Sequence, residues 1–349
     1  MAMTSDVDPV PAAAPDIIFS AWRVEGVDLE LLGIDPITFA LPELIEFCRA
    51  ALGTIALDAS TVTLVIAGDF EEAIRVRFPE DLDLQQFSLS RGSGQVGAKT
   101  MRVGDEIHVV FPAWPFFDAS AIKAVAPGED FEEFEKATAS RHLLVKRTAI
   151  HEANHVAMTQ ANEDSLDTTG KGLARRHLLD VALHVIEEYR AELGMPSDFN
   201  DSHHLQLPAD AIESLRAELT RIVTIEYPSH DNVWRLAMGV LEQASHAWKR
   251  LAYVAAARRV EGIALRAPFP DNEIGSDWNQ MVAPLWGRFE RLLSQVPSAR
   301  TRISIEELTA STRQLADLLD DWLVLLGFRW RDVGDSNSHF AIESLALFE

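Results

Sequence analysis

Alternating hydrophobic and polar positions predict a mixed α/β region over the first third of the chain. Residues 61–67 are β-branched and apolar, which predicts a buried strand. Residues 98–103 and 106–111 predict two more strands, and the Gly104-Asp105 pair between them is a hairpin signal. This part of the chain is therefore expected to form a small sheet that includes an antiparallel hairpin.

Two helices are expected beside these strands. Residues 37–52 show a helical pattern, with Pro42 near its start, where proline is favoured. Asp69 and Glu72 have the spacing of a capping box, so residues 70–77 predict a second, short helix.

From residue 131 onward, apolar positions recur at helical spacing almost to the end of the chain. The predicted helices span residues 131–162, 173–193, 210–227, 232–265, 274–294 and 305–326. The expected fold class is α+β, with a small N-terminal mixed α/β region, an antiparallel hairpin and a predominantly helical C-terminal half. We divide the chain into a flexible tail at residues 1–16, a domain at residues 17–200 and a helical domain at residues 201–349.

The predicted helix at residues 131–162 carries the motif His151-Glu152-Ala153-Asn154-His155. Residues four apart share one helix face, with about 5–6 Å between their Cβ atoms, so His151 and His155 can bind one metal ion from the same side. Glu152 follows the first histidine and can reach a water molecule on that ion. Two imidazole ligands and a carboxylate base in this spacing are typical of a zinc hydrolase site.

An ordinary helix with two histidines and a glutamate is the alternative interpretation of the motif. Apolar residues lie nearly all round this helix, a pattern that is typical of a helix inside a core. They are Leu144, Val145, Ile150, Val156, Ala157 and Met158. Histidine and glutamate side chains that are buried in such a core need partners, and a metal ion would supply them.

A catalytic zinc site takes a third protein ligand, and the predicted helix at residues 173–193 offers several candidates. They are Asp180, His184, Glu187, Glu188 and Glu192. At about 100° per residue, Glu188 and Glu192 lie at the edge of the apolar stripe, whereas Glu187 points to the opposite side. Either Glu188 or Glu192 can bind the metal while the other accepts the free ring N–H of a ligating histidine. We favour Glu188 as the ligand, and His184 and Glu187 are the alternatives.

His151-Glu152-Ala153-Asn154-His155, followed by Glu188-Tyr189-Arg190-Ala191-Glu192, resembles the gluzincin branch of HExxH zinc metallopeptidases. That branch carries a downstream E-x-x-x-D or E-x-x-A-D/N element. The resemblance implies a zincin-like domain at residues 17–200 in which His151, His155 and Glu188 hold Zn²⁺. Glu192 stands where the branch has Asp or Asn, and it is one methylene longer. The Leu-Gly-Met-Pro that follows is also distantly similar to ImmA/IrrE-type metallopeptidases.

These residues predict a zinc-dependent metallopeptidase that hydrolyses peptide bonds with zinc-activated water and Glu152 as general base. The resemblance implies an edge strand that pairs with a peptide or protein substrate, and residues 107–111 are the candidate. The oxyanion also needs a hydrogen-bond donor. The sequence offers Tyr189, Tyr227, His203, His204 and His230 without choosing among them. A non-peptide zinc hydrolase and a catalytically idle metal-binding regulatory protein are the alternatives.

Composition narrows the choice of partners. The formal net charge of −23 and the pI of 4.8 disfavour binding to nucleic acid or to an anionic membrane through bulk charge. No apolar run is long enough to span a bilayer. Cys48 is the only cysteine and lies in an apolar helical pattern, which predicts a core residue and a cytoplasmic protein. The sequence does not indicate an oligomeric state.

Overall fold

The structure is a computed structural model that describes ten segments of the chain. These segments are residues 21–25, 41–78, 90–91, 94–95, 97–116, 131–200, 202–263, 268–269, 275–334 and 337–348. The predicted tail at residues 1–16 lies outside the described residues, and so do residues 37–40 of the first predicted helix.

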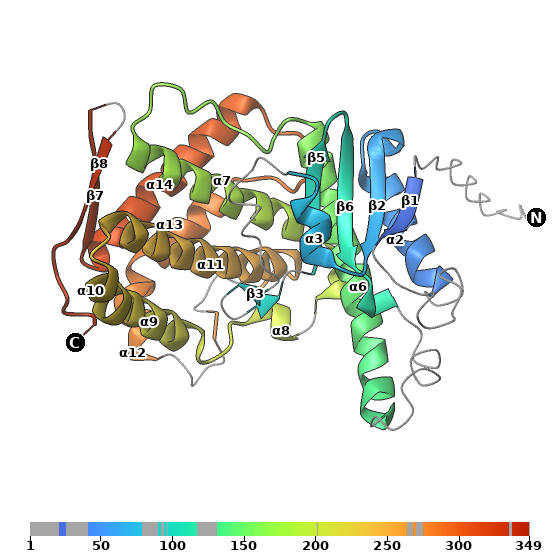
Figure 1. The fold of residues 1–349 in the computed structure, drawn as a ribbon, viewed down its shortest axis with the longest axis horizontal. Helices are drawn as coiled ribbons and strands as arrows, with labels where there is room; N and C mark the ends of the chain where they lie inside the picture. The colour runs from blue at the N-terminus through green and yellow to red at the C-terminus, as the bar shows by residue number, and fades with distance from the viewer. Residues whose placement is uncertain are drawn as a thin grey trace, which may run out of the picture.

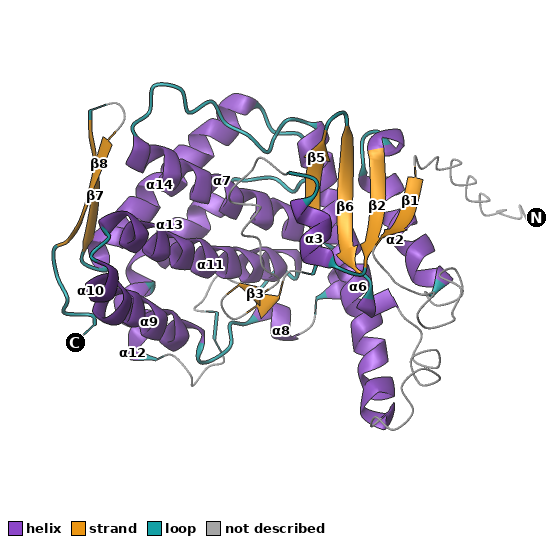
Figure 2. Ribbon diagram, in the orientation of Figure 1, coloured by secondary structure: helices purple, strands orange, loops and turns teal. Residues whose placement is uncertain are grey.

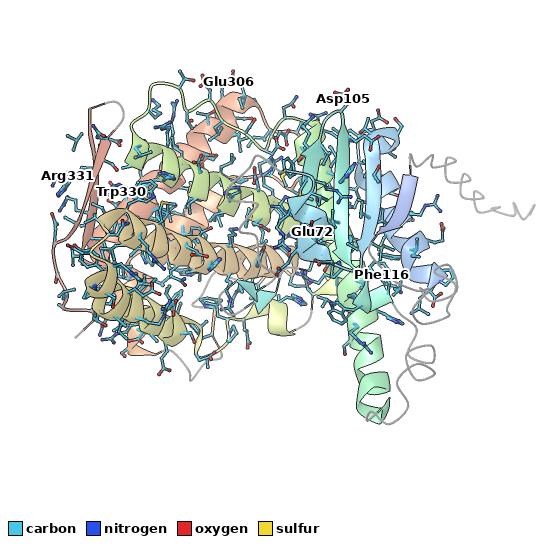
Figure 3. All side chains as sticks on the ribbon, in the orientation of Figure 1. Glu72, Asp105, Phe116, Glu306, Trp330 and Arg331 are labelled. Atoms are coloured by element: carbon cyan, nitrogen blue, oxygen red, sulfur yellow. The ribbon has the colours of Figure 1, made fainter. Side chains whose placement is uncertain are left out.

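A four-stranded mixed sheet forms one end of the molecule (Figures 1 and 2). Its strands are β1 (Ala21–Glu25), β2 (Val62–Ala67), β5 (Lys99–Val103) and β6 (Glu106–Pro112). β1 pairs parallel with β2, β2 pairs parallel with β6, and β5 pairs antiparallel with β6. The predicted hairpin is therefore confirmed. Gly104 begins its turn with a φ of 62°, which costs glycine little, and Asp105 marks the turn in Figure 3.

The prediction that residues 107–111 form an open edge of the sheet is wrong. The strand order is β1-β2-β6-β5, so β6 has a neighbour on each side and β5 is the edge strand. The burial of β6 from Ile107 to Pro112 fits this central position, because a central strand covered on both faces reads as one continuous apolar run. The local sequence does not reveal which strand of the hairpin pairs with β2.

Alternate residues of the sheet face two separate cores. The neighbouring helices are α2 (Pro42–Ile55), α3 (Phe70–Arg75) and α6 (Phe131–Gln160). Leu64 and Ile66 of β2 pack in the core shared with α2 and α6, whereas Val65 between them packs in the core shared with α3. Ala149 and Ala153 place the middle of α6 in the first of these cores. The two-residue period of the strands thus decides which face α6 covers.

Most of the described residues after α6 form a helical body around α7 and α11 (Figure 1). Its helices are α7 (Leu173–Leu193), α8 (Ser202–Leu205), α9 (Ala211–Arg221), α10 (Tyr227–His230), α11 (Val233–Val260), α12 (Ser276–Met281), α13 (Ala283–Ser294) and α14 (Ile305–Leu325). Aromatic side chains pack among the aliphatic ones in this core, as between Trp248 and Trp322, whose ring centroids are 5.9 Å apart. α7 belongs to this core and α6 to the sheet core, so the two helices meet where the cores adjoin.

Short elements connect these parts. They are the 3₁₀ turns Ala59–Thr61, Trp114–Phe116 and Ser197–Phe199, the π-turn Ile222–Glu226, and the paired strands β3 (Ser90–Arg91) and β4 (Gly94–Gln95). The helix that the pattern predicts at residues 274–294 is in fact two helices that meet at Val282. Pro284 explains the break, because proline cannot donate a hydrogen bond to the preceding turn and its ring clashes with that turn, whereas the first turn of a new helix accommodates it. The predicted fold class, α+β with a helical C-terminal half, is confirmed.

The hydrophobic pattern does not predict the C-terminal ribbon of β7 (Phe328–Val333) and β8 (Asn337–Ile342). Figure 3 labels Trp330 and Arg331 on this ribbon. Asp332 of β7 accepts hydrogen bonds from the backbone N–H groups of Ala174 and Arg175, at 2.7 and 3.3 Å. The N-cap residue of α7, Gly172, has no side chain to do this, so the ribbon caps the helix.

Candidate metal centre

The two histidines of the motif lie on one face of α6 and converge on one point. The Nε2 atoms of His151 and His155 are 3.1 Å apart, and their ring centroids are 4.8 Å apart. Their side chains are 12% and 19% exposed, so the pair lies at the margin of the core, where a ligand from solution can reach it.

Glu188 of α7 completes a group of three donor atoms. Its Oε2 atom lies 3.1 Å from His151 Nε2 and 3.5 Å from His155 Nε2. Three atoms that bind one zinc ion tetrahedrally at about 2.0–2.1 Å are about 3.3–3.4 Å from one another. The observed separations lie on both sides of this value, so the three atoms fit the ligand set of one tetrahedral ion. Within the described part of the chain, these three residues form the group with metal-ligand spacing.

The charges in contact at this point also favour a cation. Three carboxylates act on Tyr253 at this point, those of Glu152, Glu188 and Glu192, and the guanidinium of Arg147 pairs with Glu192. With both histidines neutral, as metal ligands are, the described contacts of Glu152 and Glu188 include no cation, and an excess of buried negative charge is costly. A divalent cation would balance the charges of both carboxylates, so the donor set fits Zn²⁺ in charge as well as in spacing.

Glu192 lies one helical turn beyond Glu188 and contacts the other ring nitrogen of His151. Its Oε1 atom is 2.9 Å from His151 Nδ1, and its side chain is 3% exposed. Both terminal nitrogens of Arg147 on α6 donate to the same carboxylate, Nη1 to Oε1 at 3.1 Å and Nη2 to Oε2. Glu192 therefore lies where a carboxylate can fix the orientation of His151.

Glu152, the expected general base, is buried and receives a hydrogen bond from the edge strand. The Oγ1 hydroxyl of Thr100 on β5 donates to Glu152 Oε2 at 2.6 Å. A second hydrogen bond joins the strand to the helix, from Arg102 to the backbone oxygen of Thr159 at 2.6 Å. β5 thus lies directly beside the Glu152 carboxylate, the expected general base.

Tyr253 of α11, in the helical half of the protein, contacts the metal group. Its hydroxyl donates to Glu188 Oε2 at 2.6 Å, and its ring lies edge-on to His151 with 5.9 Å between centroids. Burial and the neighbouring Glu188 carboxylate raise the pKa of Tyr253 well above its usual value, so the phenol keeps its proton. Tyr253 therefore fixes the orientation of Glu188 as a neutral donor.

The ionisation of the cluster in the absence of a metal follows from these contacts. Burial lowers the pKa of His151, but the hydrogen bonds and charges of Glu188 and Glu192 outweigh it and raise that pKa to about 10. Burial likewise raises the pKa of Glu188 and of Glu192, but contact with His151 brings both below the usual value. The metal-free site therefore holds a proton on His151 where the ion would sit.

The two ligand-bearing helices are locked together next to the site. Asn154, inside the motif, is fully buried, and its Nδ2 donates to the backbone oxygen of Ala191 on α7 at 3.0 Å. Gly194 leaves room for this side chain, since a Cβ there would lie 2.6 Å from Asn154 Nδ2. This contact sets the position of Glu188 and Glu192 relative to the motif.

The alternative third ligands lie outside the three-atom group. The His184 side chain is exposed, although it lies one turn before Glu188. Glu187 is 8% exposed, and burial together with the charges of Asp164 and Glu188 raises its pKa well above the usual value. A carboxyl group that prefers its neutral form is a poor metal ligand, so Glu188 fits the role better than Glu187.

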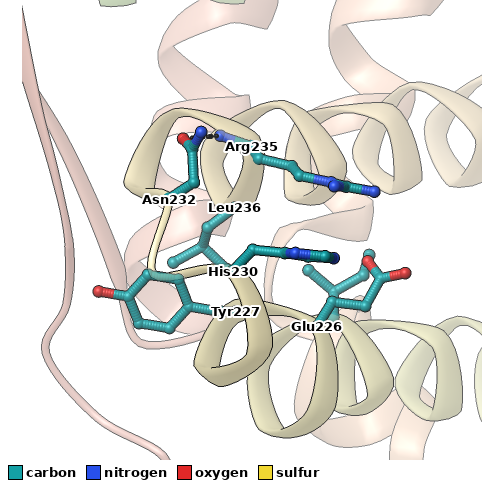
Figure 4. Close-up of a pocket in the computed structure, with 7 residues that line it drawn as sticks. Glu226, Tyr227, His230, Asn232, Arg235 and Leu236 are labelled. Carbon is teal, nitrogen blue, oxygen red and sulfur yellow. Dashed lines mark hydrogen bonds between the residues drawn. The ribbon is translucent and has the colours of Figure 1, made fainter.

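The oxyanion donors that the sequence suggests lie elsewhere. Tyr189 is buried in the helical core, where its hydroxyl accepts a hydrogen bond from Arg259 at 2.8 Å. Tyr227 and His230 line a small pocket between α10 and the start of α11 (Figure 4). The start of α11 is about 30 Å along the helix axis from Tyr253, so this pocket is remote from the metal group. The side chain of His203 lies outside the described residues, and His204 on α8 is half-buried.

Three residues of the site were missed by the sequence analysis. Arg147 had a signal, because it lies four residues before His151 and therefore on the same helix face. Thr100 and Tyr253 had none, since each reaches the site from an element that is distant in sequence.

Comparison with protein families, curated proteins and solved structures finds no match for this chain. Among the described helices, none combines the length and apolar character needed to cross a membrane.

Proposed function

We propose that this protein is a zinc-dependent metallopeptidase in which His151, His155 and Glu188 bind zinc and Glu152 is the general base. The observation that carries the proposal is the spacing of the three donor atoms, 3.1 to 3.5 Å, beside carboxylates whose charge a divalent cation would balance. A glutamate directly after the first histidine is the third part of the argument, because hydrolysis needs a proton acceptor beside the ion.

Each surrounding residue has a task in this mechanism. Zinc, when bound, polarises the substrate carbonyl and lowers the pKa of water towards about 7. Glu152 accepts a proton from the attacking water and passes it to the leaving nitrogen. The hydroxyl of Thr100 holds the Glu152 carboxylate in one orientation during both transfers. Tyr253 holds Glu188, and Glu192 holds His151.

A peptide is favoured as substrate by the position of β5. The side of β5 away from β6 has no strand partner among the described residues. Its Thr100 touches the general base, so an extended peptide that pairs with this edge would pass beside the site. β5 takes the role that the sequence analysis gave to residues 107–111. Backbone pairing of this kind suits a peptide better than a small molecule.

The proposed compartment is the cytoplasm. Cys48 is the only cysteine of the chain, is fully buried in the sheet core, and cannot form an internal disulfide. Burial raises the pKa of its thiol to about 12, so it acts as an apolar core residue.

Metal analysis and a peptide-library digest, performed on the full chain, test the proposed function. We expect one zinc per chain, cleavage of the library by the wild type, and no cleavage by Glu152→Gln, which should keep its zinc. His155→Ala should lose the metal. Purified protein without stoichiometric zinc would overturn the assignment, and so would a Glu152→Gln variant that cleaves as fast as the wild type.

A matched pair of variants tests the third ligand. Glu188→Gln should weaken zinc binding strongly, because it removes the charged ligand atom. His184→Ala, one turn earlier on the same helix, should bind zinc like the wild type, because its ring nitrogens lie outside the three-atom group. The reverse result would make His184 the ligand. Zinc binding with cleavage of amide or ester compounds but of no peptide would favour a non-peptide hydrolase.

A further inference from the structure

We propose that Arg147 is a positioning residue that holds Glu192 on His151 and keeps Glu192 from binding the metal itself. This inference rests on the metal site of the proposed function and assigns a role to a residue that the HExxH motif does not include. Arg147 touches neither the ion's ligand atoms nor the substrate, so it acts entirely through Glu192.

The geometry of the contact carries the inference. Arg147 and Glu192 lie on different helices, α6 and α7, and meet in a two-pronged contact through Nη1 and Nη2. The Glu192 side chain is 3% exposed and that of Arg147 is 14% exposed, so little water competes for the pair. A planar guanidinium that binds both oxygens of a carboxylate fixes the plane of that carboxylate. Here the fixed plane places Oε1 at 2.9 Å from His151 Nδ1.

The orientation of Glu192 determines which ring nitrogen carries the proton when His151 is neutral. A carboxylate at Nδ1 favours the tautomer that carries its proton on that nitrogen. When a metal ion replaces the second ring proton, the Nε2 lone pair of His151 would face His155 and Glu188, which is the direction of the metal group. A carboxylate that could rotate would hold this tautomer less firmly.

Arg147 also distinguishes two glutamates that are otherwise alike. Glu188 and Glu192 are four residues apart on α7 and both contact His151. Apart from the two histidines, Glu188 contacts a neutral donor, Tyr253, whereas both oxygens of Glu192 are held by the guanidinium of Arg147. Glu188 thus keeps its charge available for an ion, and Glu192 does not. A fourth protein ligand would close the coordination position that catalysis needs, and Arg147 prevents this.

Zinc affinity, measured by competition with a chelator, tests the inference without relying on activity. Arg147→Met should weaken zinc binding by about 10- to 100-fold, the usual effect of losing a residue that supports a ligand. Arg147→Lys should also weaken it, because a single ammonium cannot hold both oxygens. The cobalt-substituted Arg147→Met protein should show a changed visible absorption spectrum, because the ligand arrangement is altered. Lys146→Met is the matched control: its Nζ lies 5.4 Å from the Phe47 ring centre, and its loss should change zinc affinity less than twofold.

A double variant shows whether Arg147 acts through Glu192. Arg147→Met/Glu192→Gln should bind zinc no more weakly than Glu192→Gln alone, because the two residues form one unit. Wild-type zinc affinity and an unchanged cobalt spectrum in Arg147→Met would overturn the inference, as would fully additive effects in the double variant. If Arg147→Met does not fold, wild-type affinity in Arg147→Lys overturns it. A wild type that binds no zinc would instead overturn the proposed function.

Discussion

The hydroxyl of Thr100, on the edge strand of the sheet, donates a 2.6 Å hydrogen bond to the Oε2 of Glu152 on the motif helix. This bond joins the strand that a peptide would pair with to the carboxylate that would move the protons. A hydrogen bond to a charged group contributes about 1.5–3 kcal/mol, enough to hold a carboxylate in one orientation.

Removal of that hydroxyl is expected to slow catalysis without loss of the metal. Thr100→Val keeps the shape of the side chain and should lower kcat by about 10- to 100-fold, because the base is no longer held. Zinc content should stay at the wild-type level. Thr100→Ser restores the hydroxyl and should recover most of the rate. Thr63→Val is the matched control, since Thr63 lies in the same sheet and donates to Glu106, at 3.1 Å, outside the site. Wild-type kcat in Thr100→Val would contradict this role.

Loss of the Tyr253 hydroxyl is expected to weaken zinc binding. Tyr253→Phe leaves Glu188 without its hydrogen-bond donor, and such losses around metal ligands weaken affinity by about 10- to 100-fold. Tyr189→Phe removes a hydroxyl that contacts Arg259 in the helical core and should leave zinc affinity unchanged. Titration of both variants with zinc in a chelator buffer compares them directly. Equal affinities for the two variants would show that Tyr253 does not support the ligand.

The stability of the metal-free protein should fall as the solution becomes alkaline. Contacts with Glu188 and Glu192 raise the pKa of His151 from 6.5 to about 10 in the folded protein. A raised pKa of a base stabilises the folded state fully below pH 6.5, and this contribution is lost as pH rises towards 10. The slope that His151 adds is at most about 1.4 kcal/mol per pH unit.

Denaturant unfolding of chelator-treated protein between pH 6.5 and 10 measures this slope. The His151→Ala variant should lack it, and so should the zinc-loaded protein, because the ion replaces the proton. An identical slope in the wild type and in His151→Ala would show that other groups cause the pH dependence.

Gly172, at the start of α7, has no free space for an added methyl group. A Cβ at this position would lie 2.1 Å from the Asp332 side chain, which caps the helix from the C-terminal ribbon. We expect Gly172→Ala to lower the free energy of unfolding by about 1–3 kcal/mol, through this overlap and the displaced cap.

Gly275 provides a close control for Gly172. It is the N-cap residue of α12 and has nearly the same backbone angles, with φ −72° and ψ 163° against −67° and 165°. A Cβ at Gly275 meets nothing within 4 Å. Gly275→Ala should therefore cost only a few tenths of a kcal/mol in thermal or denaturant unfolding. Equal losses in the two variants would mean that the Asp332 contact is unimportant.

Much of the candidate site follows from helical geometry, which the sequence encodes directly. Four-residue spacing places His151 and His155 on one face of a helix, and helical phase separates Glu188 from Glu187 on the next. These inferences need only the regular rotation of a helix, so the sequence of that helix alone suffices. Arg147 obeys the same rule and could have been found in this way.

The remaining parts depended on the tertiary structure. The choice of β5 over β6 as the edge strand was made by the pairing of β2 with β6, two strands about forty residues apart in sequence. Thr100 and Tyr253 reach the site because β5 packs against α6 and α11 packs against α7. The cap on α7 comes from Asp332, near the end of the chain. Sequence periodicity describes one element at a time, whereas these contacts arise only when separate elements bury their apolar faces against one another.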